Sequence, residues 1–282
     1  MTTNDEVRAR VHGMWAAVAQ RWAEHADDVD QRGEHVTEAM LARAGVHPGD
    51  RVLELACGPG GAGLAAAERV GPEGAVVLSD VVPEMTAIAA ARAAERELTN
   101  VTTANRDLER IDEADRSFDV VLCREGLMFA VEPERAVGEI HRVLRSGGRV
   151  SVAVWGSQQD NPWLGLVFDA VTSVTGFPVP PPGVPGPFAL HDGARLRDLF
   201  STAGFADVTI EELSTPLRAP SFEAWWTRTA AVAGPLSAIL GRLDGDTAAA
   251  IAERLRDDVA PYSTAAGLEL PGLTLLASAR RS

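Results

Sequence analysis

The stretch RVLELACGPGGAG, residues 51–63, determines how the rest of the chain is interpreted. It starts as a short apolar run typical of a β-strand, breaks at a turn rich in glycine, and continues into an alanine-rich helical stretch from Ala62. A strand that ends in a glycine turn and opens a helix presents backbone N–H groups and the positive end of the helix dipole to a ligand. Glycine suits such a turn because no Cβ keeps the ligand away from the backbone. The stretch therefore predicts a binding site for a nucleotide-type cofactor.

The glycine spacing is shared by several cofactor-binding families. Gly58, Gly60 and Gly63 fit the GxGxxG pattern, and Asp80 ends the next apolar run about 20 residues later, as in dinucleotide-binding proteins. An NAD(P)-dependent oxidoreductase is therefore one interpretation. All 26 basic residues are arginine, and the absence of lysine excludes the Tyr-x-x-x-Lys pair of short-chain dehydrogenases. This weakens the oxidoreductase interpretation.

The composition of the chain limits its partners. A formal net charge of −14 argues against a nucleic acid, which needs a basic face. The polar N-terminus and the lack of an apolar run of about 18 residues predict neither a signal peptide nor a membrane span, and hence a cytoplasmic protein. Two cysteines, Cys57 and Cys123, cannot form a disulfide framework, and we locate no metal-binding cluster. The sequence leaves monomer and homodimer open.

Strand and helix signals alternate along most of the chain, as in a doubly wound α/β sheet. Near-continuous apolar strands suit a parallel sheet that helices cover on both faces. Strands are expected at 51–56, 75–80, 101–105, 118–123, 149–155, 207–213 and 273–279. Helices are expected near 62–70, 83–96, 133–145 and 192–203, the last capped by Asp192.

Three segments fall outside this alternation, and we predict that they form a cap over the site. Residues 1–44 contain two expected helices, within 5–44. Residues 157–190 are rich in proline and are expected to form a loop without long elements. Residues 214–268 separate the last two strands and contain expected helices near 228–241 and 246–258.

Several motifs in a fixed order indicate one family. Glu54 completes the string E-x-A-C-G-P-G-G, which is followed by Asp80, by Asp107, by FDVVLC at 118–123 and by LRSGG at 144–148. In this the chain resembles the class I S-adenosylmethionine (SAM) methyltransferases, closely over residues 10–155 and loosely elsewhere. The resemblance implies a Rossmann-like, seven-stranded, mostly parallel sheet with an antiparallel last strand, in a single domain over 1–282. It also implies SAM as cofactor and S-adenosylhomocysteine as product.

The resemblance also assigns roles in cofactor binding. Asp80 would accept hydrogen bonds from both ribose hydroxyls, Asp107 would accept from the adenine amino group, and Glu54 would order the glycine turn or meet the ammonium group. The string from Trp15 to Trp22 resembles the YDxxAxxYD element that closes over the cofactor. The full set implied is Glu54, Ala56, Cys57, Gly58, Gly60, Asp80, Val81, Met85, Asp107, Leu108, Arg124 and Trp22.

Methyl transfer needs alignment, exclusion of water and, for a protonated acceptor, a base. His191 is the first candidate base, with His35 and His12 behind it. The alternative for His191 is that it only precedes a helix that Asp192 caps. The sequence does not decide between these roles.

The acceptor is predicted to be a small, largely apolar organic molecule. After the fourth strand the chain reads Cys-Arg-Glu-Gly, without the Asn/Asp-Pro-Pro-Tyr/Phe motif of enzymes that methylate amino groups of bases or glutamine. The pattern is similar to quinone-biosynthesis and natural-product methyltransferases, with oxygen favoured over carbon and nitrogen. A SAM-binding protein with non-methylating chemistry is the alternative. The predicted acceptor chamber is lined by Trp15, Met128, Phe129, Trp155, Trp163 and Trp225.

Overall fold

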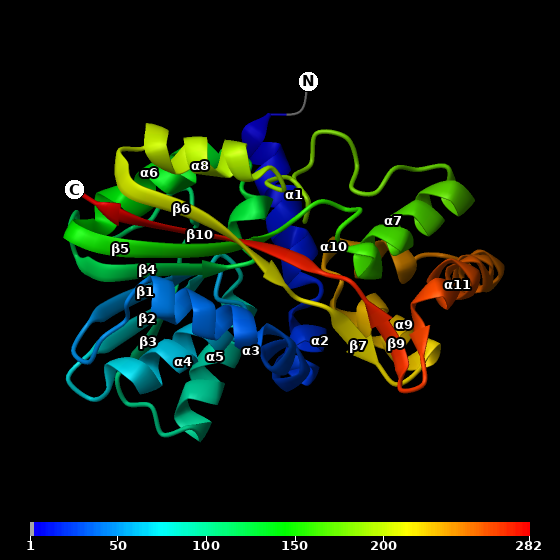
Figure 1. Ribbon diagram of the computed structural model, residues 1–282, viewed down its shortest axis with the longest axis horizontal. Coiled ribbons are helices and arrows are strands. Elements are labelled where there is room, and N and C mark those ends of the chain that lie inside the picture. The colour runs from blue at the N-terminus through cyan, green and yellow to red at the C-terminus, as the bar shows by residue number, and fades with distance from the viewer. Residues whose placement is uncertain (1–2) are drawn as a thin grey trace.

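A seven-stranded sheet forms the centre of the computed structural model, which describes residues 3–282 (Figure 1). Its order is β3-β2-β1-β4-β5-β10-β6. Neighbours from β3 to β5 are parallel, whereas β10 is antiparallel to β5 and β6, which confirms the predicted fold. The strands are β1 (Arg51–Leu55), β2 (Ala75–Asp80), β3 (Val101–Asn105), β4 (Phe118–Arg124), β5 (Leu144–Trp155), β6 (Phe205–Ser214) and β10 (Leu273–Arg281).

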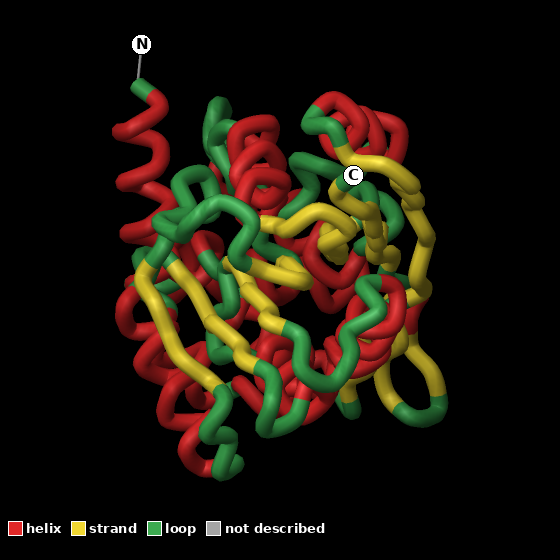
Figure 2. The backbone as a smooth tube through the Cα atoms, turned by 90° about the vertical axis from the view of Figure 1, so that its left-hand side faces the viewer, coloured by secondary structure: helices red, strands yellow, loops and turns green. Residues whose placement is uncertain are grey.

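Helices cover both faces of the sheet, and alternate residues of each strand enter two different cores. In β1, Leu53 and Leu55 pack into one buried cluster and Val52 into the other. This alternation explains why the strands are apolar throughout. Figure 2 shows the strands lying between helices. One face carries α6 (Pro133–Val143) and α8 (Gly193–Thr202), and the other carries α3 (Ala26–Arg43), α4 (Gly61–Val70) and α5 (Pro83–Glu95).

A second group of elements gathers beside one end of the sheet (Figure 1). Three short strands form a separate sheet of order β7-β9-β8, and a third buried cluster joins it to the neighbouring helices. The sequence did not indicate these strands, because each has only two to four residues. The group comprises α7 (Pro162–Thr175), β7 (Leu217–Ala219), α9 (Phe222–Val232), α10 (Pro235–Leu240), α11 (Gly245–Val259), η2 (Ala260–Tyr262), β8 (Ser263–Thr264) and β9 (Gly267–Leu270).

Two expectations for the cap segments are wrong. Residues 157–190 are not a continuous loop, because α7 fills Pro162–Thr175. Pro162 begins this helix, and proline is tolerated in a first turn, where its missing N–H has no partner to lose. The helix expected at 228–241 begins earlier, at Phe222, and is interrupted at Gly234, whose φ is +55°.

The N-terminal segment and the LRSGG motif also differ in detail from expectation. Residues 4–43 form three helices, α1 (Asn4–Ala16), α2 (Ala19–Glu24) and α3, in place of two. Residues 1 and 2 of the predicted cap lie outside the described residues. At LRSGG, the helix ends at Val143 and β5 begins at Leu144, so the glycines lie within the strand. The pairing of β5 with β4 shifts register there.

No helix within residues 3–282 is both long enough and apolar enough to cross a membrane.

Candidate active site

The glycine turn between β1 and α4 adopts a backbone that favours glycine. Gly58 and Gly60 have φ of +52° and +91°. A Cβ on Gly60 would lie 3.0 Å from the Ala89 Cβ and 3.1 Å from a Leu78 methyl carbon. Gly60 therefore turns the chain and lets α4 pack closely. Of the residues predicted to bind the cofactor, Gly60 does not line the cavity described below.

Helix α3 clamps this turn from outside. The Asp30 carboxylate accepts hydrogen bonds from Arg124 at 3.1 Å and from Arg92 at 2.7 Å, and Arg92 also donates to the Pro59 carbonyl at 2.9 Å. A Cβ on Gly61 would lie 1.8 Å from Asp30 Oδ1. The turn and α3 are therefore in such close contact that only glycine fits at position 61 without a shift.

Two buried carboxylates support the turn from inside. Asp80, at the end of β2, accepts from the backbone N–H groups of Gly58 at 2.9 Å and Val82 at 3.0 Å. Glu54, in β1, accepts from Gly63 N–H at 2.8 Å. Burial raises the pKa of both acids, that of Glu54 to about 8. The carboxylates hold the turn by hydrogen bonds to the backbone.

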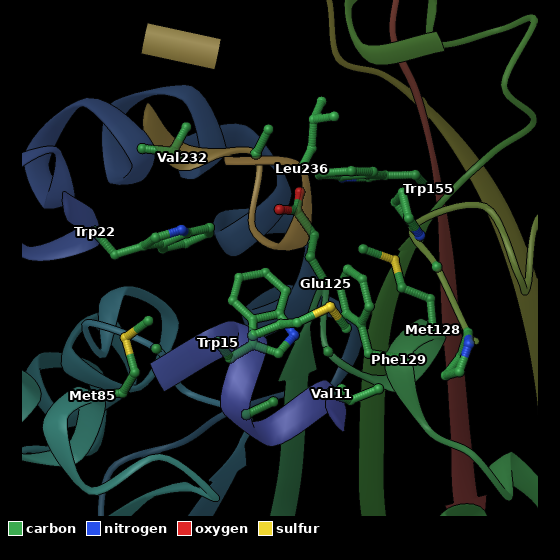
Figure 3. Close-up of a pocket in the computed structure, with 18 of the residues that line it drawn as sticks. Val11, Trp15, Trp22, Met85, Glu125, Met128, Phe129, Trp155, Val232 and Leu236 are labelled. Carbon is green, nitrogen blue, oxygen red and sulfur yellow. The ribbon is translucent and has the colours of Figure 1, made fainter. Parts of the chain in front are cut away.

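A cavity of about 280 Å³ opens above the carboxyl ends of β1, β2 and β4 (Figure 3). This is where ligands bind in open α/β sheets. One end of it, which we call the cofactor end, lies at the glycine turn and Asp80. Eleven of the twelve predicted cofactor-binding residues line the cavity: Glu54, Ala56, Cys57, Gly58, Asp80, Val81, Met85, Asp107, Leu108, Arg124 and Trp22.

The other end of the cavity, which we call the acceptor end, is rich in aromatic side chains. Trp15 packs edge-on against Trp22 and Phe129, with ring centroids 5.6 and 5.0 Å apart. Trp155 packs edge-on against Trp163 at 4.9 Å. These rings, with Met128, line the cavity as the sequence predicted. Such a lining favours a flat, largely apolar ligand.

The predicted chamber residue Trp225 lies elsewhere. Its side chain is fully buried in the third cluster, which joins the β7-β9-β8 sheet to its helices, and it packs against Phe222. It does not line the cavity. The sequence placed it in the chamber because an aromatic pair, Trp225 and Trp226, stood in the cap segment. Adjacent residues on a helix point in different directions, so the pair could not indicate which ring faces the ligand.

Two of the three candidate bases are also misplaced. His191 is exposed, and its Nδ1 lies 2.8 Å from the Phe188 carbonyl oxygen, just before α8. His35 is exposed on α3, and neither histidine lines the cavity. His12 does line it, with Nε2 4.0 Å from Asp107 Oδ2. His191 and His35 therefore lie outside the cavity, and Asp192 caps α8 as expected.

Among the charged residues of the cavity that the sequence analysis missed are Glu125, Arg32 and Arg228. Glu125 directly follows β4, and its φ of +59° is rare for a residue with a side chain. Its carboxylate projects into the space between Trp22 on one side and Trp155 and Met128 on the other (Figure 3). The position after the fourth strand was a usable signal for Glu125. No sequence signal marked the two arginines.

The donors of the site suit an organic cofactor. In the part of the chain that the structure describes, no three His, Cys, Asp or Glu side chains are grouped so as to hold a metal ion. Backbone N–H groups, a buried Asp at the end of β2 and apolar residues beside it form the cofactor end. The fold and the site together define a Rossmann-like protein of the nucleotide-cofactor class.

Comparison with known proteins finds similarity to methyltransferases. Residues 46–173 match the family described as "Methyltransferase domain". The chain is 36% identical, over 131 residues, to the ubiquinone/menaquinone biosynthesis C-methyltransferase UbiE of Xanthomonas campestris, covering 46% of this chain and 51% of the relative. The YcgJ protein of Bacillus subtilis superposes with a TM-score of 0.61 at 19% identity, covering 88% of this chain and 98% of that one.

A third similarity concerns the cofactor. A phosphoethanolamine N-methyltransferase of Haemonchus contortus, solved in complex with SAM, superposes with a TM-score of 0.55 at 18% identity, covering 88% of this chain and 52% of that one. Residues 46–173 are therefore similar to the methyltransferase domain, and the chain shares the fold of SAM-dependent methyltransferases. The chain spans about half the length of the curated relatives it matches.

Proposed function

We propose that this protein transfers the methyl group of SAM to a small, largely apolar organic acceptor. The observation that carries the proposal is one continuous cavity, which joins the cofactor end to the aromatic acceptor end and has the Glu125 carboxylate between them. A cofactor at one end and an acceptor at the other would meet beside this carboxylate. Alignment of two reactants in a shared enclosure is the main requirement of such a reaction.

The cofactor end fits SAM by the chemistry of its groups. The Asp80 carboxylate accepts two backbone hydrogen bonds and has lone pairs left for the two hydroxyls of a ribose. Val81, Met85 and Leu108 offer apolar surface for a purine. The indole N–H of Trp22 is buried without a hydrogen-bond partner among the described residues, so a ligand oxygen would satisfy it.

Glu125 is the base in this proposal, in place of the histidines. SAM supplies a methyl group on a positively charged sulfur, which leaves as a neutral thioether when the acceptor's electron pair forms the new bond. Glu125 takes the proton that the acceptor loses, so charge is balanced within the cavity. The rings of Trp15, Phe129 and Trp155 exclude water around it. The carboxylate lies 3.6 Å from the guanidinium of Arg32.

The atom that receives the methyl group is open to test. We expected oxygen from the sequence, whereas the similarity to a quinone C-methyltransferase supports carbon. Both acceptors lose a proton, so both are compatible with Glu125 as base. Mass spectrometry of the product, followed by its NMR spectrum, distinguishes an O-methyl from a C-methyl group.

Calorimetric titration with S-adenosylhomocysteine, with NADH and NADPH as controls, tests the cofactor. We expect micromolar binding of S-adenosylhomocysteine and none of the nicotinamide nucleotides. Binding of NADH instead would overturn the proposal. Methyl transfer is then assayed with labelled SAM and a panel of aromatic acceptors. A protein that binds the cofactor and converts acceptors without labelling them would be doing the alternative, non-methylating chemistry.

A further inference from the structure

The arginines that line the cavity differ in how their charges are balanced. Three of them donate hydrogen bonds to carboxylates: Arg8 to Glu109 and Glu132, Arg106 to Glu113, and Arg124 to Asp30. Arg32 and Arg228, both at the acceptor end, have no such bond among the described residues. The guanidinium N–H groups of Arg32 and Arg228, which no carboxylate accepts, can therefore donate to a ligand.

The structure gives one close acceptor to each of these two arginines. The carboxylate nearest Arg32 is that of Glu125, at 3.6 Å, and Arg228 donates to the carbonyl oxygen of Arg218 at 3.1 Å. Asp28, one turn before Arg32 on α3, has its carboxylate 3.4 Å from His25. Two guanidinium groups thus line the cavity without a hydrogen-bonded carboxylate, in a protein whose net charge is −14. An excess positive charge in an apolar cavity attracts an anion.

Arg32 is held in a fixed orientation. Its guanidinium carbon lies 4.6 Å from the centre of the Trp163 ring and 5.8 Å from that of Trp155. The Trp163 indole N–H donates to Asn161 Oδ1 at 3.2 Å, which fixes the ring on which the guanidinium rests. Burial lowers the pKa of Arg32, and the positive charges of Arg228 and Arg124 add to this effect. A bound anion would relieve that cost.

We propose that Arg32 and Arg228 bind a carboxylate of the acceptor, so that the substrates of this enzyme are aromatic carboxylic acids. The inference deepens the proposed function and depends on it. A planar guanidinium matches a carboxylate with two parallel hydrogen bonds, and the neighbouring rings of Trp155 and Trp163 accommodate the aromatic part. The two arginines hold the acid group at the acceptor end, so the rest of the molecule extends past Glu125 toward the cofactor end.

Calorimetry on the full chain, saturated with S-adenosylhomocysteine, tests this inference with pairs of probes of equal shape. The pairs are benzoate and benzamide, 2-naphthoate and 2-naphthamide, and indole-3-acetate and indole-3-acetamide. We expect at least one carboxylate to bind about 10- to 100-fold more tightly than its amide, the usual range for hydrogen bonds to a charged group. Arg32→Gln is expected to reduce this preference to about twofold, and Arg228→Gln to reduce it by a smaller factor.

Arg254→Gln is the matched control, because it removes the same charge from α11, where Arg254 pairs with Asp258 outside the cavity. It should leave the preference unchanged, and all three variants should bind S-adenosylhomocysteine as the unaltered protein does. Equal binding of every acid and amide, or an acid preference that survives Arg32→Gln, would overturn the inference. Failure of the unaltered protein to bind S-adenosylhomocysteine would overturn the proposed function instead, so the two failures are distinguishable.

Discussion

The two ends of the cavity are built in different ways. The cofactor end comes from short segments at the carboxyl ends of neighbouring strands, at Glu54–Gly58, Asp80–Met85 and Asp107–Leu108. The acceptor end is assembled from helices α1, α3, α7 and α9 and from the end of β5, which lie far apart in the sequence. The sheet fixes the first end directly. The second depends on how the cap packs against the sheet, so its residues are free to change without disturbing the cofactor end.

The largest effect is expected at the carboxylate between the two ends. Glu125→Gln keeps the size of the side chain and removes the proton acceptor, so turnover should fall by about 10²- to 10⁴-fold. Binding of S-adenosylhomocysteine should stay within about twofold, because the cofactor end is untouched. Single-turnover kinetics with labelled SAM and calorimetry measure the two quantities. A variant that retains full turnover would remove Glu125 from the reaction.

The next largest effect is expected for a substitution at Trp225, which should lower stability and leave cofactor binding unchanged. Trp225 is fully buried in the cap, so Trp225→Ala should lower the free energy of unfolding by about 3–5 kcal/mol. Affinity for S-adenosylhomocysteine should not change at a temperature where the variant is folded. Trp226→Ala, a partly buried neighbour on the same helix, is the control and should cost less. Urea unfolding measures both. Equal costs for the two variants would contradict the packing described for Trp225.

A third prediction concerns the pH dependence that Glu54 gives to the cofactor end. Burial raises its pKa from 4.5 to about 8. Between these values the folded protein keeps a proton that the unfolded chain has released, so the free energy of unfolding falls as pH rises. The loss should total on the order of 5 kcal/mol and stop above about pH 8.

Glu54→Gln cannot titrate and should lack this contribution, while its amide oxygen can still accept from Gly63 N–H. Urea unfolding of both proteins at several pH values from 5 to 9 isolates the effect of Glu54 as the difference between them. A difference that is constant over this range would show that burial does not raise the pKa of Glu54.

The smallest effect is expected for a change at Asp80, measured as affinity for the cofactor product. Asp80→Asn should weaken binding of S-adenosylhomocysteine by about 1–3 kcal/mol, because a neutral amide replaces a charged acceptor for the ribose hydroxyls. Asp112→Asn, on an exposed side chain, is the control and should have no effect. Calorimetry measures both. Unchanged affinity in the Asp80 variant would exclude Asp80 from ribose binding.

The same contrast explains what could be predicted from the sequence. The seven strands and Asp80 follow from local patterns, because strand periodicity and the glycine turn are encoded by residues near one another. His191 and Trp225 were chosen only by residue type, and their orientation depends on tertiary packing that no local pattern reports. Arg32 gave no signal, since a charged residue on an amphipathic helix is usually exposed. The structure places it in a cavity because Trp155 and Trp163 come to lie against it.

Helix α3 carries Asp30 and Arg32 two residues apart, so they lie on nearly opposite sides of the helix axis. Asp30 holds the glycine turn through Arg124 and Arg92, and Arg32 lines the acceptor end. Helix α3 therefore borders the binding sites proposed for both reactants. Any displacement of α3 by the first reactant to arrive changes the pocket that the second one enters. The two ends of the cavity are thus connected through this single helix.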